Sequence, residues 1–560
     1  MAGARWFPDI AVLMRFPIKI IAASGLSLAL FGLAPSVLLT GCASGPDFKR
    51  PEAPTATDYA PASAPLAAQT AAASAPVGAV QHLNPSRDIP FDWWTLFQSP
   101  QINTLIERAF KANPSIEAAQ AALRQADEYV SAQQGFFYPT VGVNYSATRT
   151  KLAGNMGGNS PGVQANGQVI QAGSATGAPP VKPAYYNFHT AELTVGYTPD
   201  IFGLNRRTVE SLEAQRNAQR YQLEAAYITL ASNVVAAALQ EASLRAQIAA
   251  NEKIVAANRE NLAILQKEQQ LGYVSALDVA AQQAALAQSE QSLIPLQKQL
   301  EMTRDLIRAL AGNLPDEDVP ETFELASLHL PEDLPLSLPS RLVEQRPDVR
   351  LAEEQLHAAS AQYGVAIANT MPQFSVTAAI GGMATTPGWM LKSGGGFFSL
   401  GADVAYTIFD GGTLRAKSRA AQQALVQAGA QYRSTVISAL QNVADTLHAI
   451  HSDAEALKAA ANTAQAMELT RGISRKRYEM GDLSYQMLLL AEQNYQQALI
   501  ALIQAQTNRL GDTAALYQAL GGGWWNRPNN PAQSTDGTAS AAAGAGSLPS
   551  NEPPTTQEPK

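Results

Sequence analysis

The same sequence unit occurs twice in this chain, and the duplication limits the possible folds more than any other feature. A shift of 233 residues aligns Pro114 and Pro139 of the first copy with Pro347 and Pro372 of the second. Later matches have an offset of 207 residues, so the first copy carries 26 additional residues. Any fold expected for one half of the chain must therefore also suit the other half.

Each copy contains two segments in which apolar and polar residues alternate, as in β-strands with one apolar face. In the first copy, Val141 and Val143 alternate with Gly142 and Asn144. Strands of about ten residues have the length that crosses a membrane when tilted. A soluble sheet with one apolar face has the same pattern and is the alternative. The four strands are expected at about 137–149, 187–198, 373–381 and 397–408.

Most of the remaining sequence is typical of long helices. Two segments of 65 and 67 residues contain no proline, and apolar residues recur at heptad positions in the first of them. Gly272 and Gly481 end these segments, and Ser275 and Ser484 follow as plausible caps of returning helices. Short helices that begin at prolines would complete each pair. The long helical hairpins are expected at 207–311 and 414–520.

Three polar residues occupy heptad positions of the first long segment: Glu241, Asn251 and Asn258. Polar residues at such positions either fix the register of a coiled coil or simply face solvent. The sequence leaves both interpretations open.

The first forty residues resemble a bacterial lipoprotein signal peptide. Basic residues precede an apolar run from Ile20 to Leu39, which ends in Leu-Thr-Gly directly before Cys42. Cleavage between Gly41 and Cys42 would leave the cysteine to carry S-diacylglycerol and N-palmitoyl groups. A chance cysteine after an ordinary signal peptide, or an uncleaved membrane anchor, would give a similar pattern.

Segments outside the repeats are rich in Ala, Pro, Ser, Gly and Asn, and such compositions bury little apolar area. We therefore expect a flexible tether after the signal peptide and a disordered C-terminal tail. The expected organisation is a signal peptide at 1–41, a lipid-anchored Ala/Pro-rich segment at 42–90, a first repeat at 91–312, a linker at 313–339, a second repeat at 340–522 and a tail at 523–560.

Composition argues against several classes of protein. A single cysteine excludes an intramolecular disulfide, and a net charge of −8 argues against nucleic-acid binding. The sequence contains neither a Gly-x-Ser-x-Gly nor a phosphate-loop motif, so no enzyme class and no cofactor is indicated. One acidic and histidine group has helical spacing, but a solvated helix face is the default interpretation over a metal site: Asp445, His448, His451 and Glu455.

Four membrane strands cannot close a lipid-facing barrel, because about eight is the smallest number and an open sheet edge is unstable in hydrocarbon. Several chains must therefore share one barrel. A dimer would supply eight strands and a filled lumen, whereas a trimer would supply twelve and leave an aqueous channel.

These features resemble the TolC-like outer-membrane factors, and more narrowly the lipid-anchored efflux channels of the NodT family. The resemblance covers about residues 90 to 522 and is most specific at the duplicated hairpin tips, 271–279 and 477–485. It is also seen at the strand-to-helix junctions, 200–203 and 408–412. The family implies an α+β membrane protein in which long antiparallel coiled-coil helices form an α-helical barrel. Three chains would share a twelve-stranded β-barrel.

The resemblance also implies functional residues at the tips. Some relatives carry aspartates six and nine residues after the second tip glycine, where this sequence has Met487 and Leu490. The implied gate residues are therefore Asp278 and Tyr478, although Asp278 could instead only cap a helix. The implied contacts with a periplasmic adaptor, unless these residues only make the turns, are Gly272, Val274, Ser275, Gly481, Leu483 and Ser484.

The expected function is the outer-membrane exit channel of a tripartite efflux system of a Gram-negative bacterium, most consistent with the resistance-nodulation-division type. A lipid-anchored homotrimer with a large periplasmic portion would conduct drugs or other small molecules passively from an inner-membrane pump and its adaptor. Two alternatives are an outer-membrane channel for type I protein secretion and a structural coiled-coil lipoprotein without a pore.

Overall fold

The computed structural model describes residues 43–528, except 57, 62, 64, 66, 86, 152–161, 164–168 and 171–184. The expected signal peptide and Cys42 lie outside these residues, as do the tail after residue 528 and most of the loop inserted in the first copy.

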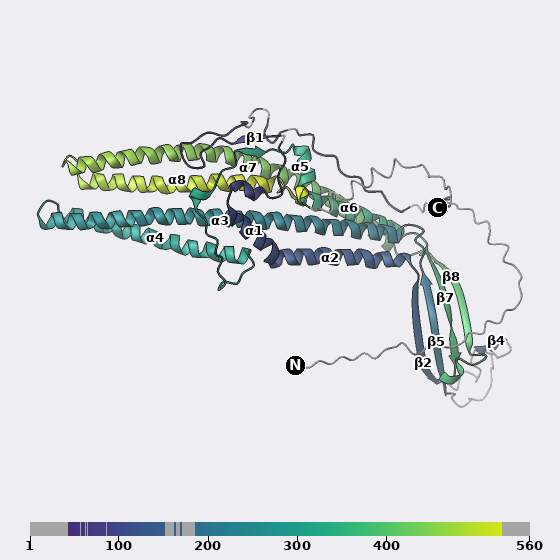
Figure 1. Ribbon diagram of the computed structural model, residues 1–560. Coiled ribbons are helices and arrows are strands. Elements are labelled where there is room, and N and C mark those ends of the chain that lie inside the picture. Colours follow the sequence, from purple (N-terminus) through teal and green to yellow (C-terminus); the bar gives the residue numbers. More distant parts are fainter. Residues whose placement is uncertain are drawn as a thin grey trace, which may run out of the picture. The chain divides into compact units, whose positions relative to one another are not determined.

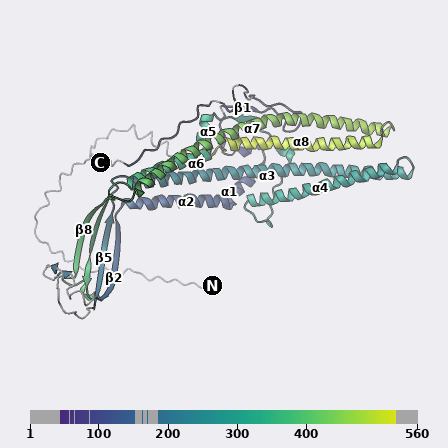
Figure 2. The same ribbon diagram turned by 180° about the vertical axis from the view of Figure 1, so that it is seen from behind.

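Two long helical hairpins run side by side, with a four-stranded sheet at the end opposite to their tips (Figure 1). In each copy, a long helix packs against the returning helix near the tip and against a short helix near the sheet. Figure 2 shows the same arrangement from behind. The helices are α2 (Pro114–Gln134), α3 (Leu204–Gln270) and α4 (Ala276–Leu310) in the first copy, and α6 (Pro347–Ala368), α7 (Thr413–Glu479) and α8 (Tyr485–Ala519) in the second.

The sheet is antiparallel throughout and joins the two copies through its central strands. The strands, in their order across the sheet, are β2 (Thr140–Lys151), β5 (Tyr185–Tyr197), β7 (Gln373–Ala384) and β8 (Gly396–Ala405). The last strand is shorter than expected: Ile408 and Phe409 lie beyond it and are almost fully exposed. Two short strands, β3 (Gly162–Val163) and β4 (Val169–Ile170), pair within the inserted loop.

A collar of small elements surrounds the middle of the helices, and the sequence analysis did not predict it. Its core contains Trp93, which is fully buried and stacks on Tyr517 of α8 with 5.4 Å between ring centroids. Parallel pairing of His82–Asn84 with Asp333–Pro335 ties the N-terminal segment to the linker between the copies. The collar elements are β1 (His82–Asn84), η1 (Trp93–Phe97), α1 (Pro100–Ala112), η3 (Leu325–Ser327), β6 (Asp333–Pro335), α5 (Pro339–Gln345) and η5 (Trp524–Asn526).

The N-terminal segment after Cys42 is not a free tether, so that expectation was wrong. Arg509 of α8 is fully buried and donates to the hydroxyl of Thr70 at 3.1 Å and to the carbonyl of Ala79 at 2.6 Å. Gln81 is also fully buried and donates to Thr513 at 3.0 Å. Buried polar groups that pair with backbone can fix a segment with few apolar residues, and composition alone does not reveal this.

The expected tail also begins too early. Residues 523–526 are folded: Trp524 is buried and its indole nitrogen donates to the carbonyl of Gln345 at 2.6 Å. Gly522 and Gly523 have φ values of 64° and 68°, which glycine adopts without strain, and they turn the chain after α8 toward this contact. The glycines that suggested a tail therefore form a specific turn.

The polar heptad residues of α3 are buried rather than solvent-exposed. Asn251 accepts a hydrogen bond from Ser292 at 3.2 Å, and Asn258 donates to Ser289 at 3.2 Å, both across to α4. Glu241 is fully buried and accepts from Arg304 at 3.4 Å. A register slip would leave these groups unpaired, so they favour one alignment of the two helices.

A histidine links the N-terminal segment to both repeats and predicts a pH dependence. His357 of α6 stacks on Phe48 with 4.3 Å between ring centroids. Hydrogen bonds to Glu354 and Glu210 raise the pKa of His357 above its ordinary value, although burial opposes the shift. This stabilisation is fully present below the unfolded pKa of about 6.5 and is lost as pH rises through the higher folded pKa.

We therefore expect the backbone amides near Phe48 to exchange hydrogen faster relative to the pH-corrected intrinsic rate as pH rises from 6 to 9. His357→Phe keeps an aromatic ring against Phe48 but cannot titrate, so it should remove this pH dependence. An equal pH dependence in His357→Phe would assign it to another group.

Candidate functional site

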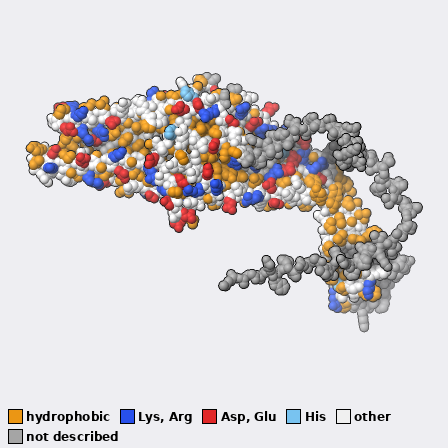
Figure 3. Space-filling view, in the orientation of Figure 1, with side chains coloured by type: hydrophobic (Ala, Val, Ile, Leu, Met, Phe, Trp, Pro, Cys, Tyr) orange, Lys and Arg blue, Asp and Glu red, His pale blue; other side chains and the backbone are white. Residues whose placement is uncertain are grey.

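The sheet has one apolar and one polar face along all four strands. Residues that lie opposite each other in an antiparallel pair share a face. One row contains Val143, Leu193, Ile380 and Phe398, in consecutive register across the sheet. These side chains are exposed, with Ile380 at 61% and Phe398 at 83% of their full accessibility. Figure 3 shows hydrophobic side chains gathered over the strands.

The opposite face is polar. The register places Asn144 beside Glu192, with 3.5 Å between the amide nitrogen and the carboxylate. Thr194, Ala379 and Ser399 continue this face across the other strands. A sheet with one exposed apolar face and one polar face can separate hydrocarbon from water.

Both edges of the sheet are open within the described residues. β2 and β8 are the edge strands, with 12 and 10 residues, and each pairs on only one side. Edge strands of this length present a row of unpaired backbone groups. The sheet is therefore a partial structure that needs further strands if its apolar face lies in lipid.

The first hairpin tip is a tight turn between α3 and α4. Gly272 has a φ of 82°, and the amide of Tyr273 returns to the carbonyl of Glu268 at 2.9 Å, which is a glycine-based helix end. Ser275 then caps α4: its hydroxyl accepts from the amide of Asp278, whose carboxylate accepts from the amide of Ser275 at 3.1 Å. Asp278 therefore has a structural role as half of a capping box.

The second tip has the same turn but a different cap. Gly481 has a φ of 79°, and the amide of Asp482 donates to the carbonyl of Arg477 at 2.9 Å. Ser484 occupies the cap position with extended backbone, but its side chain makes no cap hydrogen bond, so the expected serine cap is present only in the first copy. The side chain of Asp482 instead pairs with Arg477 at 2.9 Å.

An aromatic contact joins the two tips. Tyr485 of α8 is buried, and its hydroxyl donates to the side-chain oxygen of Gln282 in α4. Tyr478 lies against Tyr485 in an edge-on contact of 5.6 Å and donates to Glu268 of α3 at 3.4 Å. Burial raises the pKa of both tyrosines, so both hydroxyls keep their protons and remain donors at neutral pH.

A small apolar cluster completes this contact, and a groove of about 640 Å³ lies beside it between the hairpins. Val274 and Leu483 are half-buried and line the groove, whereas Gly272, Ser275, Gly481 and Ser484 are exposed. The six expected contact residues therefore divide into two groups. The cluster contains Leu265, Val279, Tyr485 and Leu488.

The sequence analysis missed several residues at the tips. Glu268 and Gln282 were not singled out because their roles depend on contacts between the two copies, which spacing within one copy does not show. Tyr273 and Met480 are 79% and 73% exposed, respectively, beside the tip glycines. Large apolar residues next to a turn glycine were the available signal for them.

Cys42 and Gly41 lie outside the described residues, so the structure does not test the expected lipidation and cleavage. Within residues 43–528, apart from the gaps given above, no group of three or more His, Cys, Asp and Glu side chains could hold a metal ion. His451, one of the four residues with metal-like spacing, contacts the backbone of Ala67 in the N-terminal segment instead.

Comparison with known proteins agrees with this architecture. The family model described as "Outer membrane efflux protein" matches residues 105–313 and 338–522. The pyoverdine export outer membrane protein OpmQ of Pseudomonas putida is 26% identical over 437 residues, which cover 77% of this chain and 88% of that protein. The toluene efflux pump outer membrane protein TtgC of Pseudomonas putida is 26% identical over 495 residues, 88% of this chain and 94% of that protein.

Solved channels have the same fold. The outer-membrane channel OprN aligns with a TM-score of 0.74 and 25% identity, over 86% of this chain and 100% of that structure. The CmeC outer membrane channel of Campylobacter jejuni aligns with a TM-score of 0.75 and 21% identity, over 88% of this chain and 98% of that structure.

Proposed function

This chain belongs to the outer membrane efflux protein family, and we propose that it is the outer-membrane exit channel of a tripartite efflux system. The observation that carries the proposal is the continuous apolar row across a four-stranded sheet with two open edges. Such a sheet suits a membrane barrel shared between chains. Transport through it needs no catalytic residue, because the driving force comes from a pump.

We infer that the assembly is a homotrimer. Three copies would join β8 of one chain to β2 of the next and give a barrel of twelve strands, wide enough for an aqueous lumen. The polar faces would line this lumen, and the long helices would continue it as an α-helical barrel on the periplasmic side.

The hairpin tips are the proposed contact with a periplasmic adaptor, which would connect the channel to an inner-membrane pump. Exposed glycine and serine at both tips allow a partner helix to approach closely, and Tyr273 and Met480 add exposed apolar area. The tyrosine contact between the hairpins would hold the tips in their closed arrangement. Cys42 would carry the lipid anchor in the same proposal.

The proposal is tested in the source bacterium by deleting the gene and measuring drug susceptibility and intracellular accumulation of an efflux dye. We expect the deletion strain to become hypersusceptible and to accumulate dye, and the intact gene to reverse both effects. Unchanged susceptibility with loss of a secreted protein would instead support type I secretion. Unchanged susceptibility with loss of envelope integrity would support the structural lipoprotein.

Asp278 allows a test of how the tips stay closed. Asp278→Asn and Ser275→Ala each break the capping box, and loss of such a cap costs about 0.5–2 kcal/mol. If Asp278 acts through the cap, as its hydrogen bonds indicate, both variants should raise antibiotic entry through the resting channel to a similar extent. Leakage in Asp278→Asn alone would favour a ring of carboxylates at the gate, and leakage in neither would remove Asp278 from gating.

Tyr485→Phe tests the contact between the hairpins. The change removes one hydroxyl and leaves the side-chain oxygen of buried Gln282 without this donor, at a cost of about 1–3 kcal/mol. We expect a larger resting conductance in planar bilayers than for the unaltered protein. Tyr495→Phe, farther along α8, is the control and should leave the conductance unchanged.

A further inference from the structure

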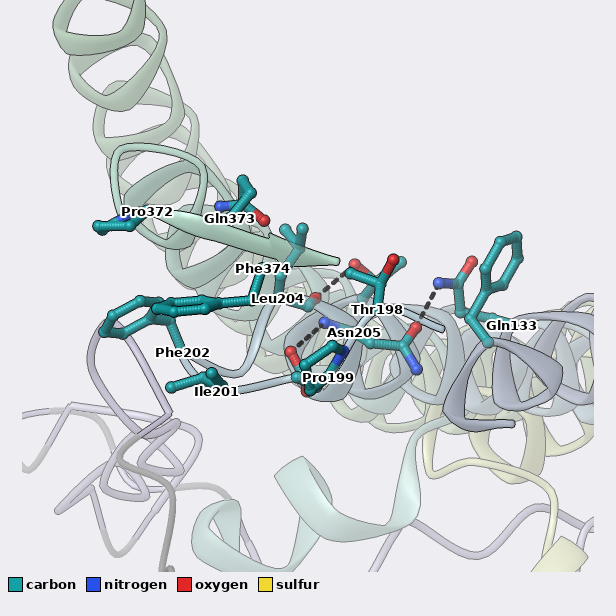
Figure 4. A pocket seen from close by; sticks show the side chains of 13 residues that line it. Gln133, Thr198, Pro199, Ile201, Phe202, Leu204, Asn205, Pro372, Gln373 and Phe374 are labelled. Carbon is teal, nitrogen blue, oxygen red and sulfur yellow. Dashed lines mark hydrogen bonds between the residues drawn. The ribbon is translucent and has the colours of Figure 1, made fainter. Parts of the chain in front are cut away.

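A pocket of about 290 Å³ lies where β5 passes into α3, at the base of the sheet (Figure 4). Its apolar lining comes from three separate parts of the chain and includes Phe136, Ile201, Phe202, Leu204 and Phe374. We call this the junction pocket. Two of its rings, Phe202 and Phe374, lie together with 6.3 Å between their centroids. The size suits part of an apolar chain, since an apolar cavity of about 150 Å³ already binds benzene.

The N-terminal segment passes directly beside this pocket. The amide of Ser44 donates to the carbonyl of Phe202 at 3.0 Å. Gly203 has a φ of 78°, and a Cβ atom there would lie 2.8 Å from the Cα atom of Ala43. A Cβ atom on Gly364 of α6 would lie 2.8 Å from the carbonyl oxygen of Ser44. Only residues without side chains at these two positions allow the segment to approach so closely.

A buried arginine holds the segment in this position. Arg207 of α3 donates to the carbonyls of Ser44 and Gly45 at 3.1 and 3.4 Å, and to the carboxylate of Asp47 at 2.7 Å. The start of the described chain is therefore fixed at the junction. Cys42 precedes Ala43, and neighbouring Cα atoms are about 3.8 Å apart, so groups attached to Cys42 begin close to the pocket.

The pocket also offers a hydrogen-bond donor. The side-chain oxygen of Asn205 accepts from Gln133 at 2.6 Å, whereas its buried Nδ2 has no partner among the described residues. Buried amide groups normally find an acceptor. The ester and amide carbonyls of a lipid-modified cysteine are acceptors of this kind.

We propose that the junction pocket binds one acyl chain of the lipid attached to Cys42, and that Asn205 donates to a carbonyl of the same lipid. The inference rests on the lipidation in the proposed function, but it does not depend on the substrate or pump. In this arrangement the lipid is part of the folded junction between sheet and helices, in addition to holding the chain to the membrane.

The experiment uses the full-length protein expressed in cells fed a palmitic acid analogue that carries a photoreactive diazirine. After irradiation and purification, the fragment carrying Cys42 is analysed for crosslinks. We expect them to concentrate at residues 199–205 and 372–374 of the same chain. Crosslinks spread along the outer face of the strands would overturn the proposal, because the acyl chains would then lie freely in the bilayer.

Two further measurements separate the possible failures. Thr198→Trp places a bulky side chain in the pocket lining and should lower these crosslinks at least tenfold while lipidation, measured by intact mass, stays complete. If that variant fails to fold, the crosslink map of the unaltered protein still decides. Crosslinks from the pocket residues to a neighbouring copy, seen with mixed isotope labels, would show that another chain fills the pocket and would overturn the proposal.

Intact mass also distinguishes this proposal from the lipidation on which it depends. An unmodified Cys42 would overturn both the anchor and the pocket assignment but would leave the channel function untouched, since drug efflux is measured separately. A lipidated Cys42 with normal efflux and no crosslinks at the pocket would overturn the pocket assignment alone.

Discussion

Ile380→Arg is expected to prevent the protein from inserting as a stable assembly in the outer membrane. Ile380 lies in the middle of the apolar row, between Leu193 and Phe398, and its side chain is 61% exposed. Arginine on the lipid face of a membrane strand costs about 2–4 kcal/mol near the midplane. Every copy in a shared barrel would bear this cost, and we expect folded protein in the outer-membrane fraction to fall below detection.

Ala379→Arg is the matched control because it introduces the same charge at the neighbouring residue. The register places Ala379 on the polar face, between Thr194 and Ser399. In the proposed barrel this side chain enters the aqueous lumen, so insertion should be normal and conductance should become less favourable to cations. If both variants insert equally well, the apolar row does not face lipid.

Gly481→Phe is expected to abolish drug efflux while the channel still assembles. A Cβ atom at Gly481 would meet no other atom within 4 Å, so the fold has room for a side chain at the second tip. The backbone has a φ of 79°, which costs a residue other than glycine about 1–2 kcal/mol. The larger effect is steric, because a phenyl ring would project from the surface that we assign to the adaptor.

Gly472→Phe provides the control at an exposed position on α7, nine residues before Gly481. Its substitution meets no atom within 4 Å and requires no unusual backbone conformation, so efflux should be unaffected. Susceptibility of the Gly481→Phe strain should equal that of the deletion strain. Loss of assembled channel in Gly481→Phe would mean that the glycine serves the fold, and normal efflux would show that this tip does not contact the adaptor.

The sequence predicted the periodic parts of the fold well because their spacing is local. Alternation placed β5 within two residues of its observed bounds, and the second long helix starts at Thr413, one residue before its expected start at Leu414. Gly272 and Gly481 identified both tips, since a left-handed helix end requires a residue without a side chain.

The collar and the contact between the tips could not be predicted in the same way. Arg509 appears in sequence as an ordinary charged residue of a helix, and only the folded chain shows that it is fully buried against Thr70 and Ala79. The pairing of Tyr485 with Gln282 joins residues 203 positions apart. Contacts of this kind depend on how the two copies pack, which the repeat pattern leaves open.

The number of chains in one channel tests the central claim most directly. Native mass spectrometry of the protein, released from the outer membrane in mild detergent, counts these chains and any acyl groups attached to them. The account predicts three copies, because three four-stranded sheets close a twelve-stranded barrel around a water-filled lumen. A monomer, or a form that is soluble without detergent, would contradict it, because the open edges of the sheet would then have no partner strands.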